Sequence, residues 1–272
     1  MSARPLMTRP LIMGVLNVTP DSFSDGGHYL APEDAIARGR ALVEVGADIV
    51  DVGGESTRPG AEIVGVAEEI ARVKPALEAL NAAGIITSID TMNAETARVA
   101  VAAGTRYVND VSGGQSDPEL LRVVAESNTA ILIAGHWRGR LDAGDSLARY
   151  DDPVREVVAE LTQIVAGARA AGIPPERIIL DPGLGFSKTG AHNWAILRGL
   201  DRLTALGFPL LIGASRKRFL GELLPADADV AERDLPTAVL TALIADAGIW
   251  GVRVHEPQAS ARALDVWERL RA

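Results

Sequence analysis

The sequence predicts a single-domain α/β protein, a (β/α)8 TIM barrel that spans residues 1–272. Short β-branched apolar runs alternate with longer amphipathic stretches, and this unit occurs eight times along the chain. Each apolar run carries few charges, which is typical of parallel strands buried on both faces. Eight units joined by short turns favour closure, because a closed barrel leaves no sheet edge exposed and usually takes about 250 residues.

The expected strands are the β-branched apolar runs, in chain order Leu11–Val18, Asp48–Val52, Ile85–Ile89, Tyr107–Val111, Ala130–Ala134, Ile178–Leu180, Leu210–Gly213 and Gly251–Val254. The expected helices follow them with Ala, Leu, Glu and Arg patterns: Pro32–Val45, Val66–Ala82, Ala94–Ala103, Pro118–Ser127, Pro153–Ala171, Asn193–Ala205, Pro236–Ala247 and Pro257–Arg271. Several helices begin with proline, whose missing N–H costs nothing in the first turn. Several end at a glycine that can adopt the left-handed conformation of a helix end.

An open, doubly wound sheet is the alternative fold. It would place a Gly-x-Gly-x-x-Gly turn after the first strand, whereas residues 19–25 there read TPDSFSD. The chain also lacks a linker rich in Pro, Gly and Ser, so we expect one domain.

Charge and composition exclude several classes of function. Lys and Arg total 27 against 36 Asp and Glu, and the net charge of −9 repels nucleic acids and acidic membranes. The chain has no cysteine, which excludes thiolate nucleophiles, thiolate metal sites and disulfides. No apolar run approaches the roughly 18 residues of a membrane helix, and the first residues do not resemble a secretory signal. We expect a cytoplasmic protein that binds any anionic ligand in a local cationic pocket.

Polar residues follow the expected strands at one end of the barrel, where the reacting groups of such barrels lie. Each residue alone has a structural alternative, since Asp90 or Asp110 can cap a helix and His255 can be a hydrogen-bonded core histidine. All eight strand ends carry such a residue, which favours a site. These residues are Asn17, Asp51, Asp90, Asn109, His136, Asp181, Lys217 and Arg253.

The strand-end residues separate by charge. Acceptors and amides suit the edge of a neutral heterocycle that carries amino, ring N–H and carbonyl groups. Three strand ends supply them: Asp90, Asn109 and Asp181. Positive charge gathers at the last strands: Lys217, Arg253 and His255, with Ser215, Arg216 and Arg58 nearby. Because the loops after the seventh and eighth strands usually bind phosphate in barrels, we predict a heterocycle joined to a phosphate or diphosphate. A solvated helix start is the alternative for residues 216–218.

Two long loops and one amide complete the expected site. Residues 19–31 and 53–65 are rich in small, hydroxyl and turn residues, and are expected to close over a substrate unless they are tolerated insertions. The four histidines form no His-x-His or His-Glu-x-x-His pattern, so a multi-histidine zinc site is not expected. The oxygen of Asn17 together with substrate phosphates suits Mg²⁺, which keeps most of its waters.

Seven motifs resemble those of the dihydropteroate synthase family, and the resemblance covers almost the whole chain. They are Met13–Gly27 (MGVLNVTPDSFSDGG), Asp51–Gly60 (DVGGESTRPG), Ser88–Thr91 (SIDT), Asn109–Gly113 (NDVSG), Asp181–Phe186 (DPGLGF), Ser215–Lys217 (SRK) and Arg253–His255 (RVH). They follow one another in the order of the family.

The resemblance implies a (β/α)8 enzyme, commonly a homodimer. Such an enzyme condenses 4-aminobenzoate with (7,8-dihydropterin-6-yl)methyl diphosphate and releases diphosphate and 7,8-dihydropteroate for folate synthesis. The resemblance places the pterin at Asp90, Asn109, Asp181 and Lys217. It places the diphosphate at Thr57, Arg253 and His255, and magnesium at Asn17. It lines the aminobenzoate slot, where sulfonamides compete, with Phe23, Pro59 and Phe186.

The chemistry of this reaction agrees with the residue types. Loss of diphosphate before attack leaves a cation conjugated into the dihydropterin, which Asp90 and Asp181 would stabilise. Lys217, Arg253, His255 and magnesium would neutralise the departing diphosphate. The aniline nitrogen is already a nucleophile, so no catalytic serine or cysteine is required.

Two positions depart from the family pattern. Gly135 stands where the family commonly has a methionine against the pterin, so we expect space there, which either loosens the packing over the pterin or is filled by a different side chain. If the space is vacant, Gly135→Met should tighten pterin binding. Arg218 stands where a serine is common, and its guanidinium could bind the aminobenzoate carboxylate in place of the hydroxyl.

Three other functions remain open from the sequence. A methyltransferase that uses methyltetrahydrofolate would not need the cations at the last two strands. A Schiff-base aldolase would use Lys217, which is alone among the three lysines in following a strand. A non-catalytic pterin-binding paralogue would release no diphosphate when both substrates are added.

Overall fold

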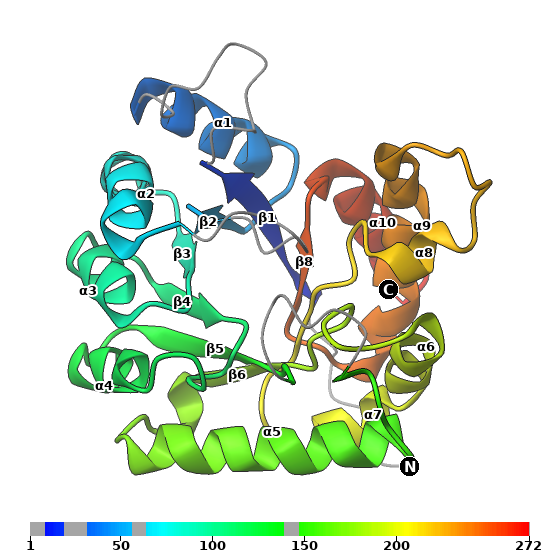
Figure 1. Cartoon of the computed structure of the whole chain (residues 1–272). Coiled ribbons are helices and arrows are strands. Elements are labelled where there is room, and N and C mark those ends of the chain that lie inside the picture. The colour runs from blue at the N-terminus through cyan, green and yellow to red at the C-terminus, as the bar shows by residue number, and fades with distance from the viewer. Residues whose placement is uncertain (1–8, 19–31, 56–63, 139–146, 272) are drawn as a thin grey trace.

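The computed structural model describes residues 9–18, 32–55, 64–138 and 147–271, which form one barrel of alternating strands and helices (Figure 1). Eight parallel strands form a single sheet in the order β6-β5-β4-β3-β2-β1-β8-β7. The strands are β1 (Leu11–Asn17), β2 (Ile49–Gly53), β3 (Thr87–Asp90), β4 (Tyr107–Asp110), β5 (Ile131–Gly135), β6 (Ile178–Asp181), β7 (Leu211–Ile212) and β8 (Gly251–Val254). The predicted (β/α)8 fold is confirmed.

The barrel closes between β6 and β7. Leu180 and Leu210 form a parallel bridge, and the Leu180 N–H donates to the carbonyl of Pro209 at 2.9 Å. Pro209 has no N–H to donate in return, which limits the ladder at this seam. The seam nevertheless brings the ends of β6 and β7 together, and both carry residues of the expected site.

Helices cover the outside of the barrel. They are α1 (Pro32–Glu44), α2 (Val66–Ala82), α3 (Ala94–Ala102), α4 (Glu119–Glu126), α5 (Pro153–Ala170), α6 (Gly190–Arg198), α7 (Leu200–Thr204), α8 (Arg218–Gly221), α9 (Asp234–Ile244) and α10 (Pro257–Arg269). Short 3-10 turns η3 (Pro175–Arg177), η4 (Val230–Arg233) and η5 (Ala245–Ala247) connect some of them. Two helices begin with proline as the sequence predicts, and in the structure a carboxylate caps each of them: Asp152 caps α5 and Glu256 caps α10.

The stretch Asn193–Ala205, expected as one helix, is two. Gly199 ends α6 and starts α7 with φ −102° and ψ 23°, outside the helical region. A β-carbon at Gly199 would lie 2.8 Å from Val154 Cγ1, so α5 packs against the bare backbone here. The break therefore comes from a close approach between elements distant in sequence.

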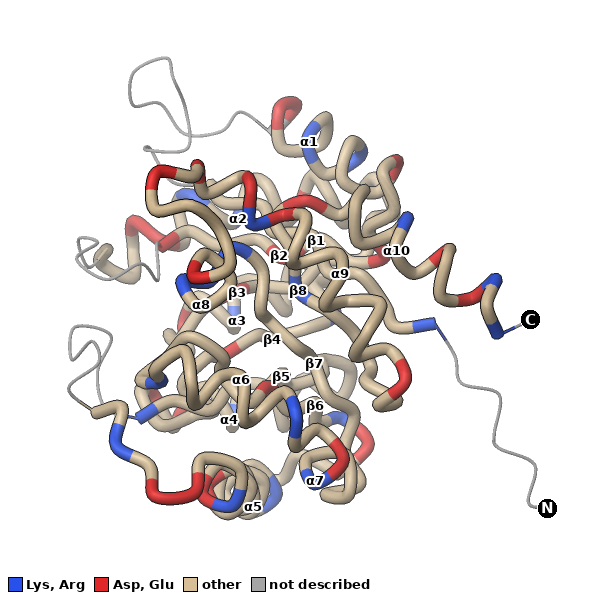
Figure 2. Tube along the Cα trace, turned by 90° about the vertical axis from the view of Figure 1, so that its right-hand side faces the viewer, with Lys and Arg blue, Asp and Glu red and all other residues tan. Residues whose placement is uncertain are grey.

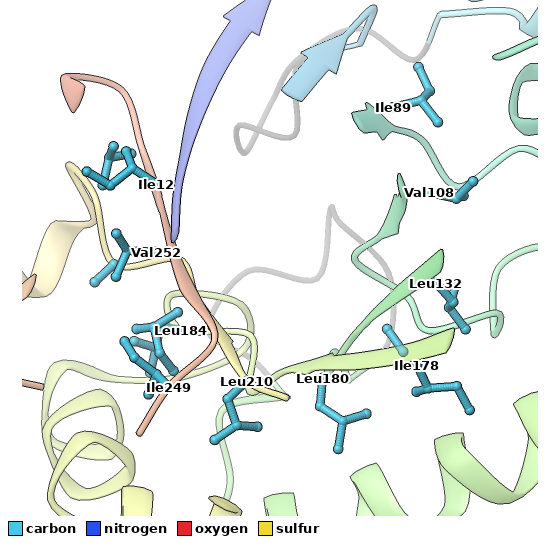
Figure 3. Close-up of a cluster of buried hydrophobic side chains, with 14 of the residues drawn as sticks. Ile12, Ile89, Val108, Leu132, Ile178, Leu180, Leu184, Leu210, Ile249 and Val252 are labelled. Carbon is cyan, nitrogen blue, oxygen red and sulfur yellow. The ribbon is translucent and has the colours of Figure 1, made fainter. Parts of the chain in front are cut away.

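Two apolar layers hold the fold together. The larger layer lies between strands and helices, and Figure 3 shows Ile89, Val108, Leu132 and Leu180 pointing outward from their strands. The smaller layer fills the inside of the barrel with Met13, Ile49, Ile133, Ile179 and Leu211. Because side chains alternate along a strand, the residue two positions after each inner one also faces inward. That rule places the next inner layer at the carboxyl ends of the strands.

Acidic and basic residues are distributed along the surface helices, with both signs on α1, α5 and α10 (Figure 2). Within the described parts of the chain, no helix combines the length and apolar character needed to cross a membrane.

Candidate active site

The inner layer at the carboxyl ends of the strands is polar. Asp51 follows Ile49 by two residues on β2, and Asp181 follows Ile179 by two residues on β6. Arg253 on β8 and Asn109 on β4 reach the same layer, since both bond to Asp51. Within two residues along the strands, the inside of the barrel thus changes from apolar to polar. We call the polar layer of Asp51, Asn109, Asp181 and Arg253 the polar floor.

Arg253 bridges two carboxylates in this floor. Its Nε donates to Asp51 Oδ2 at 2.6 Å and its Nη2 donates to Asp90 Oδ2 at 2.6 Å. The Asn109 amide also donates to Asp51 Oδ2, at 3.2 Å. Burial raises the pKa of Asp90 to about 7, although the charge of Arg253 opposes this rise. Arg253, assigned to the diphosphate by the resemblance, is therefore paired with acidic groups before any substrate binds.

Lys217 lies over the Asp181–Phe186 turn. Its Nζ is 3.9 Å from the centroid of the Phe186 ring. Gly185 has φ +79°, and a β-carbon there would lie 2.7 Å from Lys217 Cδ, so only glycine lets the lysine stem pass. Burial, and then the charge of Arg253, lower the pKa of Lys217 to about 8. The structure thus brings together a lysine with a lowered pKa and an aromatic ring.

Asp181 is held at the start of the same turn. Its Oδ1 accepts a hydrogen bond of 2.7 Å from the Gly183 N–H, and its Oδ2 faces Gly213, at 3.4 Å from the position of a β-carbon there. Burial raises the pKa of Asp181, while the Gly183 N–H and Lys217 lower it. The absence of a side chain at Gly213 leaves that carboxylate oxygen open toward the barrel axis.

His255 and Ser215 form a pair beside this floor. The Ser215 hydroxyl lies 3.1 Å from both the backbone N and the Nδ1 of His255. Burial and the charge of Arg253 lower the pKa of His255 to about 4, so the ring is neutral near neutral pH. Arg216 makes a bidentate pair with Asp234, at 2.8 and 2.7 Å. The cationic residues predicted at the last two strands are therefore present, but Asp234 compensates the charge of Arg216 and His255 is neutral.

Asn17 lies at the edge of this region. A β-carbon at Gly53 would be 3.5 Å from Asn17 Oδ1 and 3.8 Å from Asp90 Oδ2, so the two oxygens face the same bare backbone. Asn17, Arg216 and His255 also line a cavity of about 440 Å³ between β1, α1 and the start of α10. The Asn17 oxygen beside this open space fits a magnesium ion that takes few protein ligands and several waters, whereas Asp90 Oδ2 is already bonded to Arg253. In the described ranges, no group of three or more His, Asp or Glu side chains could hold a metal without such outside ligands.

Several predicted residues cannot be placed. Phe23, Thr57, Arg58 and Pro59 lie outside the described residues, as do loop residues 19–31 and 56–63. Arg218 is an exposed first residue of α8. The remaining predicted site residues lie at or beside the carboxyl-terminal rim.

Two strand-end residues have structural roles. Asp110 accepts hydrogen bonds from the backbone N–H groups of Ser112 and Gly114, at 2.8 and 2.6 Å, and so fixes the turn after β4. His136 is fully buried and bonds to Glu160 and Lys188, behind the Asp181–Phe186 turn. Both residues support the site without lining it.

The roles of two residues, Asp51 and Lys188, were not predicted. Asp51 appears in the sequence only as one strand-end residue among eight, yet it holds Arg253 in place. Its Oδ1 is buried and has no hydrogen-bond partner within the described structure. Lys188 carried no predicted role because it does not follow a strand, yet it is buried. The signal available for Asp51 was its position two residues after the inner Ile49.

The expectation of vacant space at Gly135 is wrong. A β-carbon there would lie 2.5 Å from the carbonyl oxygen and 2.6 Å from the Cα of Val111. The backbone after β4 therefore fills the position that a side chain would take. A substitution must displace main chain rather than enter a gap.

Gly135→Met is accordingly expected to weaken pterin binding by about tenfold and to lower stability, since overpacking of a core costs about 1–3 kcal/mol. Calorimetric titration with a pterin and thermal unfolding measure the two effects. Gly167→Met is the control, because nothing lies within 4 Å of a β-carbon at that helix position. Tighter pterin binding by Gly135→Met would contradict the filled position.

Comparison with known proteins agrees with this geometry. Residues 13–255 match the family described as pterin binding enzyme. The chain is 52% identical to the dihydropteroate synthase of Mycobacterium leprae, over 94% of this chain and 91% of that protein. A structure of the Xanthomonas albilineans dihydropteroate synthase with 4-aminobenzoic acid has a TM-score of 0.89 at 42% identity, covering 98% of this chain and 94% of that one. A structure of the Yersinia pestis enzyme with a sulfonamide drug has a TM-score of 0.90 at 34% identity, covering 100% and 98%. The chain belongs to the dihydropteroate synthase family of pterin-binding enzymes.

Proposed function

We propose that this chain catalyses the condensation of (7,8-dihydropterin-6-yl)methyl diphosphate with 4-aminobenzoate to 7,8-dihydropteroate and diphosphate. One observation carries the proposal: in a chain of this family, Asp90, Asn109, Asp181, Lys217 and Arg253 meet at one rim of the barrel. Acceptors, an amide and cations are the groups that a pterin with an attached diphosphate requires. The chain is then a transferase of the pterinylmethyl group.

The pterin would lie on the polar floor. Asp181 Oδ2, left open by Gly213, would accept from the amino and ring N–H groups, and the Asn109 amide would bind the ring from a neighbouring strand. Lys217 would donate to an acceptor of the ring. Each of these partners is buried or half-buried, so an analogue that lacks the matching group would leave it unpaired.

The reaction then needs charge stabilisation of both signs. When the methylene C–O bond breaks, its electron pair leaves with the diphosphate and a cation forms on the pterin methylene. Asp90 and Asp181 stabilise that cation, while Lys217 and Arg253 face the departing anion. The aniline nitrogen of 4-aminobenzoate attacks the methylene and loses a proton to solvent. Neutral His255 would act as a hydrogen-bond partner of the diphosphate rather than as a charge.

Magnesium is part of the proposal. Asn17 would hold the ion through its amide oxygen, with the substrate phosphates and waters as the other ligands. When bound, the ion would supply positive charge to the leaving diphosphate. Since Arg253 is shared with Asp51 and Asp90, this external charge would add to a site whose own cations are largely compensated.

The direct test is formation of dihydropteroate from the two substrates with Mg²⁺, with each component omitted in turn and a sulfonamide added as a competitor of 4-aminobenzoate. We expect product and diphosphate in equal amounts only in the complete mixture. Pterin binding without diphosphate release would favour a non-catalytic paralogue. Methyl transfer from methyltetrahydrofolate, or trapping of substrate on Lys217 by borohydride, would favour the other two alternatives.

The activity is expected to depend on pH through Asp90 and Lys217. Asp90, with its pKa raised to about 7 by burial, loses its charge as the pH falls below that value. Lys217, with its pKa lowered to about 8 mainly by burial, loses its charge as the pH rises above that value. The value of kcat/KM for the pterin substrate should therefore peak between about 7 and 8. In Lys217→Arg, any residual activity should keep its plateau above pH 9, because a guanidinium stays charged. A wild-type profile that is flat to pH 9.5 would contradict this assignment.

We further propose that the chain forms a homodimer and works in the cytoplasm. The chain exposes apolar side chains on neighbouring helices, at i, i+4 and i+8 of α9, at one residue of α10 and at the residue that follows α10. They are Leu235, Val239, Leu243, Val266 and Leu270, which are 51–78% exposed. Such an exposed apolar patch favours association, and a two-fold dimer is the commonest way for identical chains to cover one. A cytoplasmic setting is supported by the absence of cysteine from the chain.

Leu243→Glu is expected to convert the dimer to a monomer at about 10 μM, since it places a charge in the centre of the patch. Light scattering after size exclusion measures the mass. Ile86→Glu, at an exposed apolar residue before β3, is the matched control and should remain a dimer. A wild-type protein that is monomeric at this concentration would refute the proposed dimer.

A further inference from the structure

Lys188 is a buried lysine immediately behind the candidate active site. Lys188 has one of the largest fully buried side chains in the described structure, and only 2% of its surface is exposed. Its Nζ lies 2.9 Å from His136 Nδ1, 3.0 Å from the Gly183 carbonyl oxygen and 3.1 Å from the Phe186 carbonyl oxygen. An ammonium group has three N–H donors, so these three acceptors use all of them.

His136 connects Lys188 to a carboxylate on α5. His136 Nε2 lies 2.6 Å from Glu160 Oε2. Burial and the charge of Lys188 lower the pKa of His136 to about 4, so the ring is neutral near neutral pH. Nδ1 therefore accepts from Lys188, and the Nε2–H donates to Glu160. Burial alone would raise the pKa of Glu160, but hydrogen bonds from His136 and Arg138 lower it to about 2.

The charges of this network balance. Arg138 donates to Glu160 at 3.0 Å and to Glu156 at 2.8 Å, with its guanidinium over the Tyr150 ring at 3.8 Å. The cations Arg138 and Lys188 thus match the carboxylates of Glu156 and Glu160. Burial lowers the pKa of Lys188 to about 7, and the nearby carboxylates of Asp181 and Glu160 oppose this. A buried ammonium is tolerated when it is both paired and fully hydrogen-bonded.

The same turn presents its other atoms to the site. The N–H of Gly183 donates to Asp181 Oδ1, while its carbonyl accepts from Lys188. The ring of Phe186 lies under Lys217, while its carbonyl accepts from Lys188. Only glycine fits at position 183, because a β-carbon there would lie 1.8 Å from the His136 carbonyl oxygen. One ammonium thus fixes the backbone on both sides of the turn.

We propose that Lys188 is a positioning residue, which holds Asp181 and Phe186 in place for the pterin and for Lys217 and takes its counter-charge from Glu160 through His136. The kinetic part of this inference rests on the proposed function. The structural part, an ordered turn between residues 181 and 188, does not. No atom of Lys188 needs to touch substrate for this role.

The test compares Lys188→Met, which keeps the length of the side chain and removes its donors, with Lys74→Met at an exposed lysine of α2. In Lys188→Met we expect amide hydrogen exchange of residues 181–188 to accelerate at least tenfold, with exchange of β2 and β4 unchanged. We expect the KM values of both substrates to rise about tenfold and kcat to fall less than threefold. Lys74→Met should match the wild type in every measurement.

A second measurement observes the ammonium directly. The chain has only three lysines, so nitrogen-15 spectra of the ammonium groups can be assigned. The Lys188 ammonium should exchange slowly with water, vanish in Lys188→Met and shift in Glu160→Gln, which retains the lysine and loses the counter-charge. If Lys188→Met does not fold, Glu160→Gln carries the test through this shift and through faster exchange of residues 181–188. Unchanged amide hydrogen exchange of residues 181–188 in folded Lys188→Met would overturn the proposal. An ammonium signal of Lys188 that stays at the same position in Glu160→Gln would also overturn it. A wild type that makes no dihydropteroate would refute the proposed function and leave both structural readouts standing.

Discussion

Lys217→Ala is expected to lower kcat for dihydropteroate formation by about 10²- to 10³-fold, the usual loss when one preorganised electrostatic group is removed from a site. The reason is its position. The ammonium is held over the Phe186 ring at 3.9 Å and interacts electrostatically with both Asp90 and Asp181. Because Asp51 and Asp90 compensate the charge of Arg253, and His255 is neutral, the loss of Lys217 removes a large share of the positive charge that faces the developing anion.

The matched control for Lys217→Ala is Lys74→Ala. Lys74 is exposed on α2, where it pairs with Glu78, so its loss should leave turnover within about twofold of the wild type. Thermal unfolding of both variants checks that they remain folded. Near-normal turnover by folded Lys217→Ala would refute its role. Covalent capture of substrate by borohydride in the wild type, absent from Lys217→Ala, would instead assign a Schiff-base reaction.

The fold could be predicted because its signal is local and repeated. Strands such as β5 and β6 are short apolar runs that end at a glycine or an aspartate, and α2 begins and ends where its pattern predicts. The break between α6 and α7 could not be predicted in the same way. It depends on Val154 reaching the backbone of Gly199, a contact between residues 45 positions apart. Patterns within a window of a dozen residues hold no information about such contacts.

The sequence predicted which residues lie at the rim of the barrel, but not which of them pair with one another. The alternation of strands and loops places Asp90, Asp181 and Lys217 at one rim, and in the structure the charges of both carboxylates act on Lys217. Their roles in the reaction stay predictions. The ion pair of Arg253 with Asp51 joins residues 202 positions apart, so no spacing rule reveals it. The same limit applies to Gly135, where the backbone that follows β4 fills the apparent gap. Charge counted along a sequence therefore overestimates the free charge of a folded site.

Asp51→Asn is expected to lower kcat/KM for the pterin substrate by about 10²-fold, because a displacement of about 1 Å in a reacting site can cost this much. Asp51 is fully buried, and its Oδ2 binds both Arg253 Nε and the Asn109 amide. An amide at this position keeps the volume and loses the charge that orients Arg253. Breaking a buried ion pair costs about 3–5 kcal/mol, and the lower end applies here because Asp90 remains as a partner. Chemical unfolding measures that loss.

Asp48→Asn provides the comparison at the opposite end of β2. Asp48 accepts from the Ile12 N–H at 2.7 Å and lies on the rim that serves stability in barrels. Its substitution should lower stability while kcat/KM stays within about threefold of the wild type. If Asp51→Asn loses stability but keeps its kcat/KM, then Arg253 does not need Asp51 for its position.

A double substitution measures how far the effects of Asp51 and Arg253 depend on each other. Arg253 uses Nε for Asp51 and Nη2 for Asp90, and the single ammonium of a lysine cannot reproduce this fork. Arg253→Lys should therefore lose the bridge by itself, and adding Asp51→Asn should then cost less than it does in the wild type. The kcat/KM losses of the two single variants should sum to more than that of the double variant, since residues in contact share the interaction that each substitution removes. Additive losses would show that Asp51 and Arg253 act independently, and that the bridge between the two carboxylates does not position the guanidinium for the diphosphate.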